Sequence, residues 1–204
     1  MKTKIEHLIL GCILAPLAPI AGLLGFWCLS FTLLSEKWIP VCALSGLALG
    51  ILVDLVILKK LLARADQLGM VFWIAVFLFY TVGVFGFFMG VPVPNAALAI
   101  PAGFVVGGKL AHETADQTRV RRDSRQTCIL TTGLLALVCI ASAFFALASP
   151  STPSDLRGML GLGFEVTQTM VWGLILAGGT GLLVVNWLLT ILSVRLTYRF
   201  LCKS

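Results

Sequence analysis

Three polar side chains stand inside apolar runs of this sequence, where they could do chemistry. Asp54 is the sharpest candidate, since it lies within the apolar stretch 39–58, between Val53 and Leu55. A charged group at the centre of a membrane helix costs about 2.5–3.5 kcal/mol on insertion scales, so it needs a partner or a water-filled cavity. Asp54 is therefore a candidate transport residue. The alternative is structural, because Lys59 and the lipid head groups are within its reach.

The other two polar candidates are asparagines. Asn186 lies near the middle of the apolar run 170–193, where it could hydrogen-bond across helices as packing or line a substrate path. Asn95 follows a proline-rich turn and is well placed to cap a helix that begins at Ala96. The start of such a helix would aim free N–H groups into the bundle, as in transporters whose broken helices bind anionic groups.

No catalytic or metal-binding set accompanies these residues. His7 and His112 both lie at the ends of apolar runs, so a serine, histidine and carboxylate set cannot be assembled inside the membrane. An aspartyl mechanism needs a second embedded carboxylate beside Asp54. The cysteines form no C-x-x-C pair and read as small buried hydrophobes: Cys12, Cys28, Cys42, Cys128, Cys139 and Cys202. We expect no enzymatic activity, no cofactor and no metal.

The composition indicates which solvent surrounds these residues. Of 204 residues, 59% are hydrophobic and 12% are charged, and the mean hydropathy is +1.02. Soluble domains carry about 25% charged residues. So few charges could not cover a water-exposed surface, so lipid must surround most of the chain. The sequence predicts an all-α, polytopic helical membrane bundle.

Apolar runs define about six transmembrane spans in what we expect to be a single transmembrane domain over residues 1–204. Their predicted ranges are 8–34, 39–58, 69–90, 94–110, 127–148 and 170–193. The fourth run is short, roughly 20–25 Å long as a helix, so it could either cross the bilayer or re-enter on the same side.

The distribution of basic residues favours a crossing. Residues 109–125 form a basic connector that contains Lys109, Arg119, Arg121, Arg122 and Arg125. If the fourth run crosses, thirteen of the fifteen lysines and arginines lie on one side, and only Lys37 and Arg157 lie on the other. Since basic connectors stay in the cytoplasm, this predicts six spans with both termini inside, in a bacterial or archaeal plasma membrane.

Prolines and glycines mark breaks and packing faces along these runs. We expect hinges or kinks where prolines remove backbone hydrogen bonds: Pro16, Pro19, Pro92, Pro94 and Pro101. Glycine pairs let a neighbouring helix approach closely, and the candidates are Gly46, Gly50, Gly178 and Gly179.

Two connectors have features of their own. The outer loop 149–169 contains Thr152 and Asp155 at the spacing of a capping box, with Pro153 at the first helical position, which predicts a short helix. The basic connector 109–125 is expected to contact anionic lipid head groups, with a cytoplasmic partner as the alternative. Because the net charge of +6 is spread over short connectors, we expect no nucleic-acid binding.

The sequence predicts the fold class, but it leaves more than one class of function open. Broken elements, glycine faces and an intramembrane acid favour transport of a small molecule or ion, by a carrier or the membrane-embedded substrate-binding component of one. The alternative is a non-catalytic accessory or scaffold subunit, in which Asp54 pairs with a cation and the glycine faces dock on another membrane subunit or a second copy. A lipid-modifying enzyme would need an acid and a base that the sequence does not supply. A carrier predicts a hydrated cavity at Asp54 or Asn186, whereas a scaffold predicts packed polar groups and an open glycine face.

Overall fold

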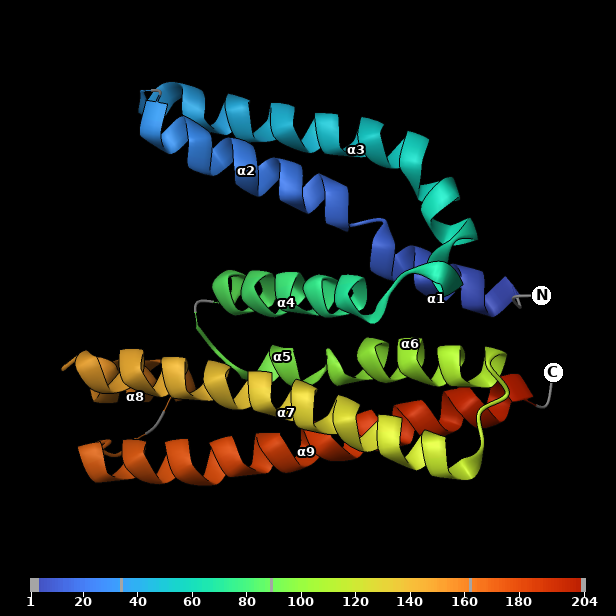
Figure 1. The fold of residues 1–204 in the computed structure, drawn as a ribbon. Coiled ribbons are helices and arrows are strands. Elements are labelled where there is room, and N and C mark those ends of the chain that lie inside the picture. The colour runs from blue at the N-terminus through green and yellow to red at the C-terminus, as the bar shows by residue number, and fades with distance from the viewer. Residues whose placement is uncertain (1–3, 34, 89, 162, 203–204) are drawn as a thin grey trace. The chain divides into compact units, whose positions relative to one another are not determined.

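The computed structural model describes residues 4–33, 35–88, 90–161 and 163–202, and these are helices joined by short turns, with no strand among them (Figure 1). The prediction of an all-α fold is confirmed. The elements are α1 (Lys4–Leu14), α2 (Leu17–Leu33), η1 (Glu36–Trp38), α3 (Ile39–Ala63), η2 (Ala65–Gln67), α4 (Met70–Phe87), α5 (Val93–Ala96), α6 (Ala99–His112), α7 (Gln117–Ala148), α8 (Thr152–Leu160) and α9 (Gln168–Cys202).

The described residues contain six helical segments long and apolar enough to cross a membrane. They are Ile5–Leu33, Glu36–Ala63, Met70–Phe87, Val93–His112, Gln117–Ala148 and Gln168–Cys202. The fourth segment has 20 residues, and at 1.5 Å per residue it matches a hydrocarbon core of about 30 Å. The polytopic membrane class is confirmed, and the inside orientation of the termini stays a prediction.

The chain divides into two compact units, Met1–Val76 and Phe77–Ser204, so the division falls within α4. The prediction of a single domain over residues 1–204 stays a prediction.

In the first unit, α2 and α3 lie side by side as an antiparallel pair (Figure 1). Their backbones touch because glycines face the neighbouring helix. A Cβ added at Gly46 would collide with the carbonyl oxygen of Gly22, and one at Gly50 would lie 2.6 Å from the Cα of Pro19. Small residues allow this approach, which brings dispersion contacts that lipid tails alone do not provide.

Pro16 and Pro19, both predicted as hinge residues, have different positions in the structure. Helix α1 ends at Leu14 and α2 begins at Leu17, so the helical break lies at Pro16. Pro19 lies in the first turn of α2, where its missing N–H has no intrahelical acceptor to lose. Pro16 is therefore the break, and Pro19 is accommodated without one.

The second unit is built on α6, α7 and α9, which contact one another pairwise. Here too glycines set the closest approach, because a Cβ at Gly107 on α6 would lie 2.6 Å from the carbonyl oxygen of Val194 on α9. A hydrophobic cluster joins the ends of these helices: Val106, Leu110, Ala115, Val120 and Val194, with Tyr198 packed against it.

The prolines before α6 act as helix starters. Pro92 precedes the single turn of α5, Pro94 lies within it, and Pro101 lies in the first turn of α6. The fixed φ of proline suits first turns, so the chain changes direction through two short helical starts rather than an extended loop. Gly90 enters this turn with φ of 83°, a conformation that glycine adopts without strain.

Two helices run well past their predicted ranges. Helix α7 begins at Gln117, ten residues before the predicted 127, and α9 continues to Cys202, nine residues after the predicted 193. Asp116 caps α7 by accepting a hydrogen bond from the backbone N–H of Arg119 at 2.9 Å. Much of the basic connector is therefore helical, so the spacing of its arginines follows the helical repeat.

The short helix predicted in the outer loop is α8, but its cap lies one residue earlier than expected. Ser151 precedes the helix, and its hydroxyl donates to Asp155 Oδ2 at 2.8 Å. Thr152, the expected cap, instead donates to the carbonyl oxygen of Ala146 at 2.6 Å, which ties the start of α8 to the end of α7. The helix ends at Gly161 with φ of 61°, the left-handed conformation common at helix ends.

Candidate functional site

Asp54 lies in the middle of α3 and is partly exposed, between the exposed side chains of Val53 and Leu55. Among the salt bridges of the described residues none involves Asp54, so the structure does not pair it with Lys59. The carboxylate therefore stands on the surface of the first unit within an apolar helix.

Asn186 occupies a different environment, with a side chain that is 0% exposed. Its Oδ1 accepts a hydrogen bond from Thr132 Oγ1 on α7 at 3.1 Å, and its Nδ2 donates to the carbonyl oxygen of Ala96 on α5 at 3.5 Å. One turn away, the hydroxyls of Thr131 and Thr190 lie 3.1 Å apart. The amide thus fastens α9 to α7 and to α5.

Asn95 lies inside α5, so the prediction that it caps a helix beginning at Ala96 is wrong. Pro92 precedes α5 and Leu98 precedes α6, because the prolines themselves start the helical turn. Asn95 is 3% exposed, and its Nδ2 donates to the carbonyl oxygen of Thr81 on α4 at 3.0 Å. Its Oδ1 is buried without a hydrogen-bond partner among the described residues.

The predicted glycine faces differ in what they meet. Gly46 and Gly50 contact α2 of the same chain, whereas a Cβ at Gly178 or Gly179 on α9 would meet nothing within 4 Å. The tightest approach in the second unit comes from Gly103 and Gly107, which the sequence reasoning missed. They have the same four-residue spacing as Gly46 and Gly50, and that spacing was the available signal.

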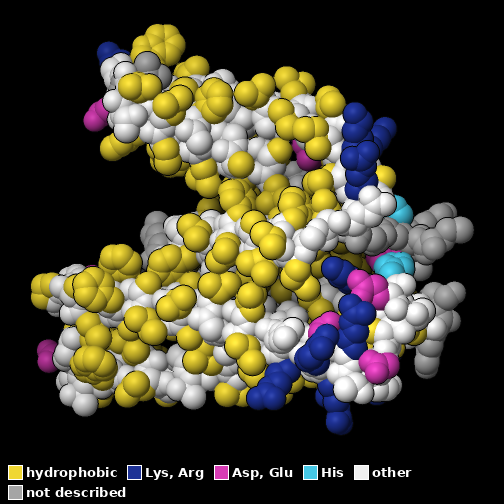
Figure 2. All heavy atoms as spheres, viewed as in Figure 1, with side chains coloured by type: hydrophobic (Ala, Val, Ile, Leu, Met, Phe, Trp, Pro, Cys, Tyr) yellow, Lys and Arg dark blue, Asp and Glu magenta, His cyan; other side chains and the backbone are white. Residues whose placement is uncertain are grey.

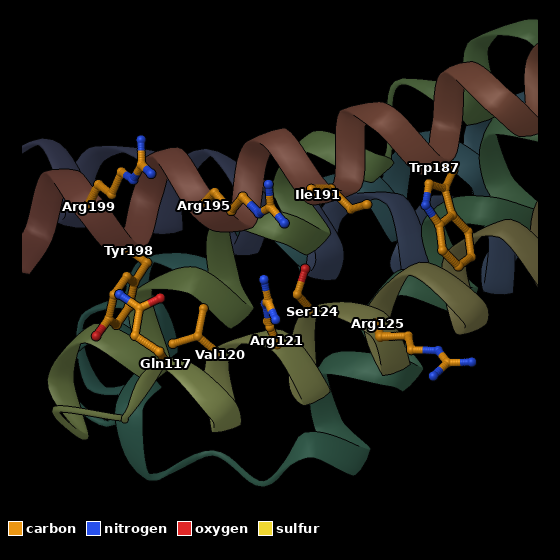
Figure 3. A pocket seen from close by; sticks show the side chains of 10 residues that line it. All are labelled: Gln117, Val120, Arg121, Ser124, Arg125, Trp187, Ile191, Arg195, Tyr198 and Arg199. Carbon is orange, nitrogen blue, oxygen red and sulfur yellow. The ribbon is translucent and has the colours of Figure 1, made fainter.

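A cavity of about 420 Å³ lies between the first turns of α7 and the last turns of α9 (Figure 3). None of the three polar candidates lines it. Its walls are formed by Gln117, Val120, Arg121, Ser124, Arg125, Trp187, Ile191, Arg195, Tyr198 and Arg199.

Helical periodicity brings four arginines to this cavity. Arg121 and Arg125 are four residues apart on α7, and Arg195 and Arg199 are four apart on α9, so each pair lies on one helix face. Figure 3 shows the guanidinium groups of Arg121 and Arg195 turned toward each other, with the Ser124 hydroxyl in the same space. Sequence reasoning used all four arginines as topology signals and placed Arg121 and Arg125 in a connector expected to contact anionic lipid head groups, but it did not predict that they meet Arg195 and Arg199.

The acidic residues nearby neutralise other arginines. Arg119 pairs with Glu113 and lies 3.7 Å from Asp123, and Arg122 lies 3.2 Å from Asp123. No acid lines the cavity, and the salt bridges of the described residues include none of its four arginines. In Figure 2, Lys and Arg side chains of the second unit gather at one end, while hydrophobic side chains are spread over the rest of the visible face.

Helix packing fixes the position of the two cavity walls. Tyr198 Oη donates to the carbonyl oxygen of Ala115 at 2.7 Å, which joins the last turns of α9 to the turn before α7. Below the arginines, Cys128 of α7 is fully buried against α9, and its Sγ lies 3.9 Å from the carbonyl oxygen of Trp187. The cavity thus lies between two packed helices, with Arg121 and Arg195 near its middle and Trp187, Ile191 and Arg125 further along (Figure 3).

Among the described residues, no three His, Cys, Asp or Glu side chains gather in a way that could hold a metal ion. The fold and its apolar helices define a multi-pass helical membrane protein. No protein-family model, no curated protein and no solved structure matches the chain.

Proposed function

We propose that this chain is a non-catalytic subunit of a larger membrane assembly. The carrying observation is that Asn186 is 0% exposed and has both side-chain polar atoms hydrogen-bonded within its own unit. A carrier presents intramembrane polar groups to its substrate, so they must be reachable from a hydrated cavity. Asn186 instead performs the packing role of an intramembrane amide.

Two surface features support an association with another membrane chain or a second copy. Gly178 and Gly181 are exposed on α9 with nothing near a would-be Cβ, which leaves room for another helix backbone. Asp54 interrupts the apolar surface of α3, where a cation from a partner would offset its desolvation. Helices in lipid associate through such small-residue faces and polar pairs.

The membrane setting completes this proposal. The charge bias of the connectors would place both termini and the residues 109–125 on the cytoplasmic side of a bacterial or archaeal plasma membrane, facing its anionic lipids.

Transport of a small molecule or ion is the second candidate, and one observation favours it. Asn95 Oδ1 is a buried oxygen without a partner among the described residues, next to the break between α5 and α6. Carbonyl oxygens at interrupted membrane helices coordinate cations in secondary transporters. In this reading the chain is a carrier or the substrate-binding component of one.

Purification from native membranes in mild detergent tests the two functions together. Wild type and Asp54→Asn are compared for co-purifying membrane chains and for thermal stability with metabolites, ions and lipids. The subunit proposal expects a second chain, or a second copy, in fixed ratio with wild type and its loss from Asp54→Asn. Glu36→Gln, which removes an acid at the end of the same hairpin, serves as the matched control and should keep the assembly.

The opposite outcome favours transport. A substrate at 100 times its dissociation constant should stabilise the wild type by about 2.7 kcal/mol. A single compound with that effect on a lone wild-type chain, lost in Asp54→Asn and kept in Glu36→Gln, would replace the subunit proposal with a carrier.

A further inference from the structure

We propose that the cavity between α7 and α9 binds one anionic phospholipid, with its phosphate between Arg121 and Arg195 and an acyl chain along Trp187 and Ile191. This inference does not depend on the subunit proposal. It rests on the charge of the cavity, the type of its basic residues and the apolar character of one end.

The charge of the cavity calls for an anion. Four arginines line about 420 Å³ of space that no carboxylate shares. Figure 3 shows the guanidinium groups of Arg121 and Arg195 turned into this space, whereas those of Arg125 and Arg199 extend away from it. Like charges held around a cavity repel one another, and a bound anion removes that repulsion. Glu113 and Asp123 are within the same connector, yet they pair with Arg119 and Arg122 outside the cavity.

The positive-inside rule does not account for this arrangement. That rule counts lysines and arginines in cytoplasmic connectors and makes no demand on where their side chains meet. In the first unit, the basic residues that satisfy the positive-inside rule at the end of α3 are Lys59, Lys60 and Arg64. In the second unit all four cavity cations are arginines, whose planar forks match two phosphate oxygens at once, as lysine cannot.

The apolar end of the cavity selects a lipid over a free phosphate. Trp187 and Ile191 precede Arg195 on the same face of α9 at four-residue intervals, and they lie toward the apolar middle of the helix. A ligand that fills the whole cavity meets the guanidinium groups of Arg121 and Arg195 and, further along α9, the apolar side chains of Trp187 and Ile191, where the Arg125 guanidinium extends away from the cavity (Figure 3). A phospholipid at the cytoplasmic surface matches both groups of side chains, and basic pockets between membrane helices on that side bind such head groups.

Ser124 adds a neutral donor at the phosphate position. It is buried on α7 one turn from Arg121, and Figure 3 shows its hydroxyl in the same space as the Arg121 and Arg195 guanidinium groups. A hydroxyl and two guanidinium groups can together donate to several oxygens of one phosphate. The cavity therefore offers directed donors in addition to diffuse positive charge.

Quenching of Trp187 fluorescence tests the proposal. The full chain is placed in phosphatidylcholine vesicles, and phosphatidylglycerol with brominated acyl chains is titrated against brominated phosphatidylcholine. The difference between wild type and Trp187→Phe isolates this tryptophan from the other four. We expect the anionic lipid to quench Trp187 at a much lower membrane fraction than phosphatidylcholine does. Equal quenching by both lipids would overturn the proposal.

Matched charge variants separate a site from general attraction. Arg121→Gln or Arg195→Gln should weaken the response on the order of tenfold, because each removes a charged donor to phosphate. Arg122→Gln removes the same charge from a neighbouring position outside the cavity, and its effect should stay within about threefold. Equal losses in all three variants would mean surface electrostatics only and would overturn the site.

Two further experiments test whether the variants are misfolded and whether the ligand is a soluble anion. Arg121→Lys and Arg195→Lys keep the positive charge but lose the planar guanidinium fork, so their affinity for the anionic lipid should be intermediate. Their far-ultraviolet circular dichroism spectra should be unchanged. Wild-type affinity in both variants would overturn phosphate recognition by the guanidinium forks. Inorganic phosphate added to wild type should leave the quenching in place. Reversal of quenching by phosphate, at concentrations where equal ionic strength from chloride has no effect, would assign the cavity to a free anion and overturn the lipid.

Discussion

Asn186 on α9 accepts a hydrogen bond from Thr132 on α7 at 3.1 Å, from a position that is 0% exposed. The same amide donates to the carbonyl oxygen of Ala96, so a single side chain links three helices of the second unit. In lipid, where apolar burial between helices contributes little, such a bond holds helices in one register.

Substitution of Asn186 should therefore reduce stability without removing a ligand. For Asn186→Leu we expect a loss of about 0.6–1.7 kcal/mol, which runs from the average to the maximum measured for hydrogen bonds between membrane helices. Thr132→Val should cost a similar amount, and the double variant should cost less than the sum because both remove the same bond. Unfolding of the four proteins in mixed micelles measures this coupling. Strict additivity would mean that the bond contributes nothing.

A second prediction concerns the contact between α6 and α9. Gly107→Ala would place a Cβ 2.6 Å from the carbonyl oxygen of Val194, so we expect destabilisation by about 1–3 kcal/mol from overpacking. Gly133→Ala on α7 is the control, because a Cβ there would meet nothing within 4 Å. The control should be neutral or more stable by up to about 1 kcal/mol, as alanine favours helix. Equal effects in the two variants would contradict the close approach.

The spans could be predicted from the sequence because burial in lipid demands long apolar helices, and that demand is local. The ends of α7 and α9 could not be predicted in this way, because the polar residues next to each apolar run were taken to lie outside the helix. Arginine is a good helix former, and Asp116 supplies a cap, so α7 starts before the apolar run begins. The length of an apolar run therefore predicts the part of a helix that lies inside lipid, and it underestimates the length of the whole helix.

The cavity escaped sequence reasoning for a different reason. Arg121 and Arg195 are far apart in the chain, and only the packing of α7 on α9 brings them together. The four-residue spacing within each arginine pair was visible in the sequence, but no local signal says which helices are neighbours. The sequence places Asn186 inside an apolar run, but it could not predict the hydrogen bond from Thr132, because that residue lies on a different helix.

The orientation of the chain gives a third prediction. In a cysteine-free background, Asp155→Cys should react with a membrane-impermeant thiol reagent added outside intact cells, and Arg122→Cys should react only after the membrane is opened. The physical reason is that residues 109–125 carry the densest positive charge, and connectors rich in lysine and arginine stay in the cytoplasm. The reverse labelling pattern would place the basic connector outside and contradict the charge argument.

Asp116 caps the helix that forms one wall of the cavity. Its carboxylate accepts the backbone N–H of Arg119 at 2.9 Å, and the helical turns that follow carry Arg121 and Ser124. Asp116→Ala should cost about 0.5–2 kcal/mol locally, whereas Asp116→Asn should keep most of the cap. Hydrogen exchange should therefore quicken over residues 117–125 in Asp116→Ala, with residues 128–148 unchanged.

The same variants connect the cap to lipid binding. If α7 must be helical from Gln117 for Arg121 to face Arg195, Asp116→Ala should weaken quenching of Trp187 by anionic lipid although it removes a negative charge. General electrostatics predicts the opposite sign, because loss of an acid makes the connector more positive and should strengthen attraction to anionic lipid. Stronger quenching in Asp116→Ala would thus favour diffuse attraction, and weaker quenching with faster exchange would favour a site built by the cap.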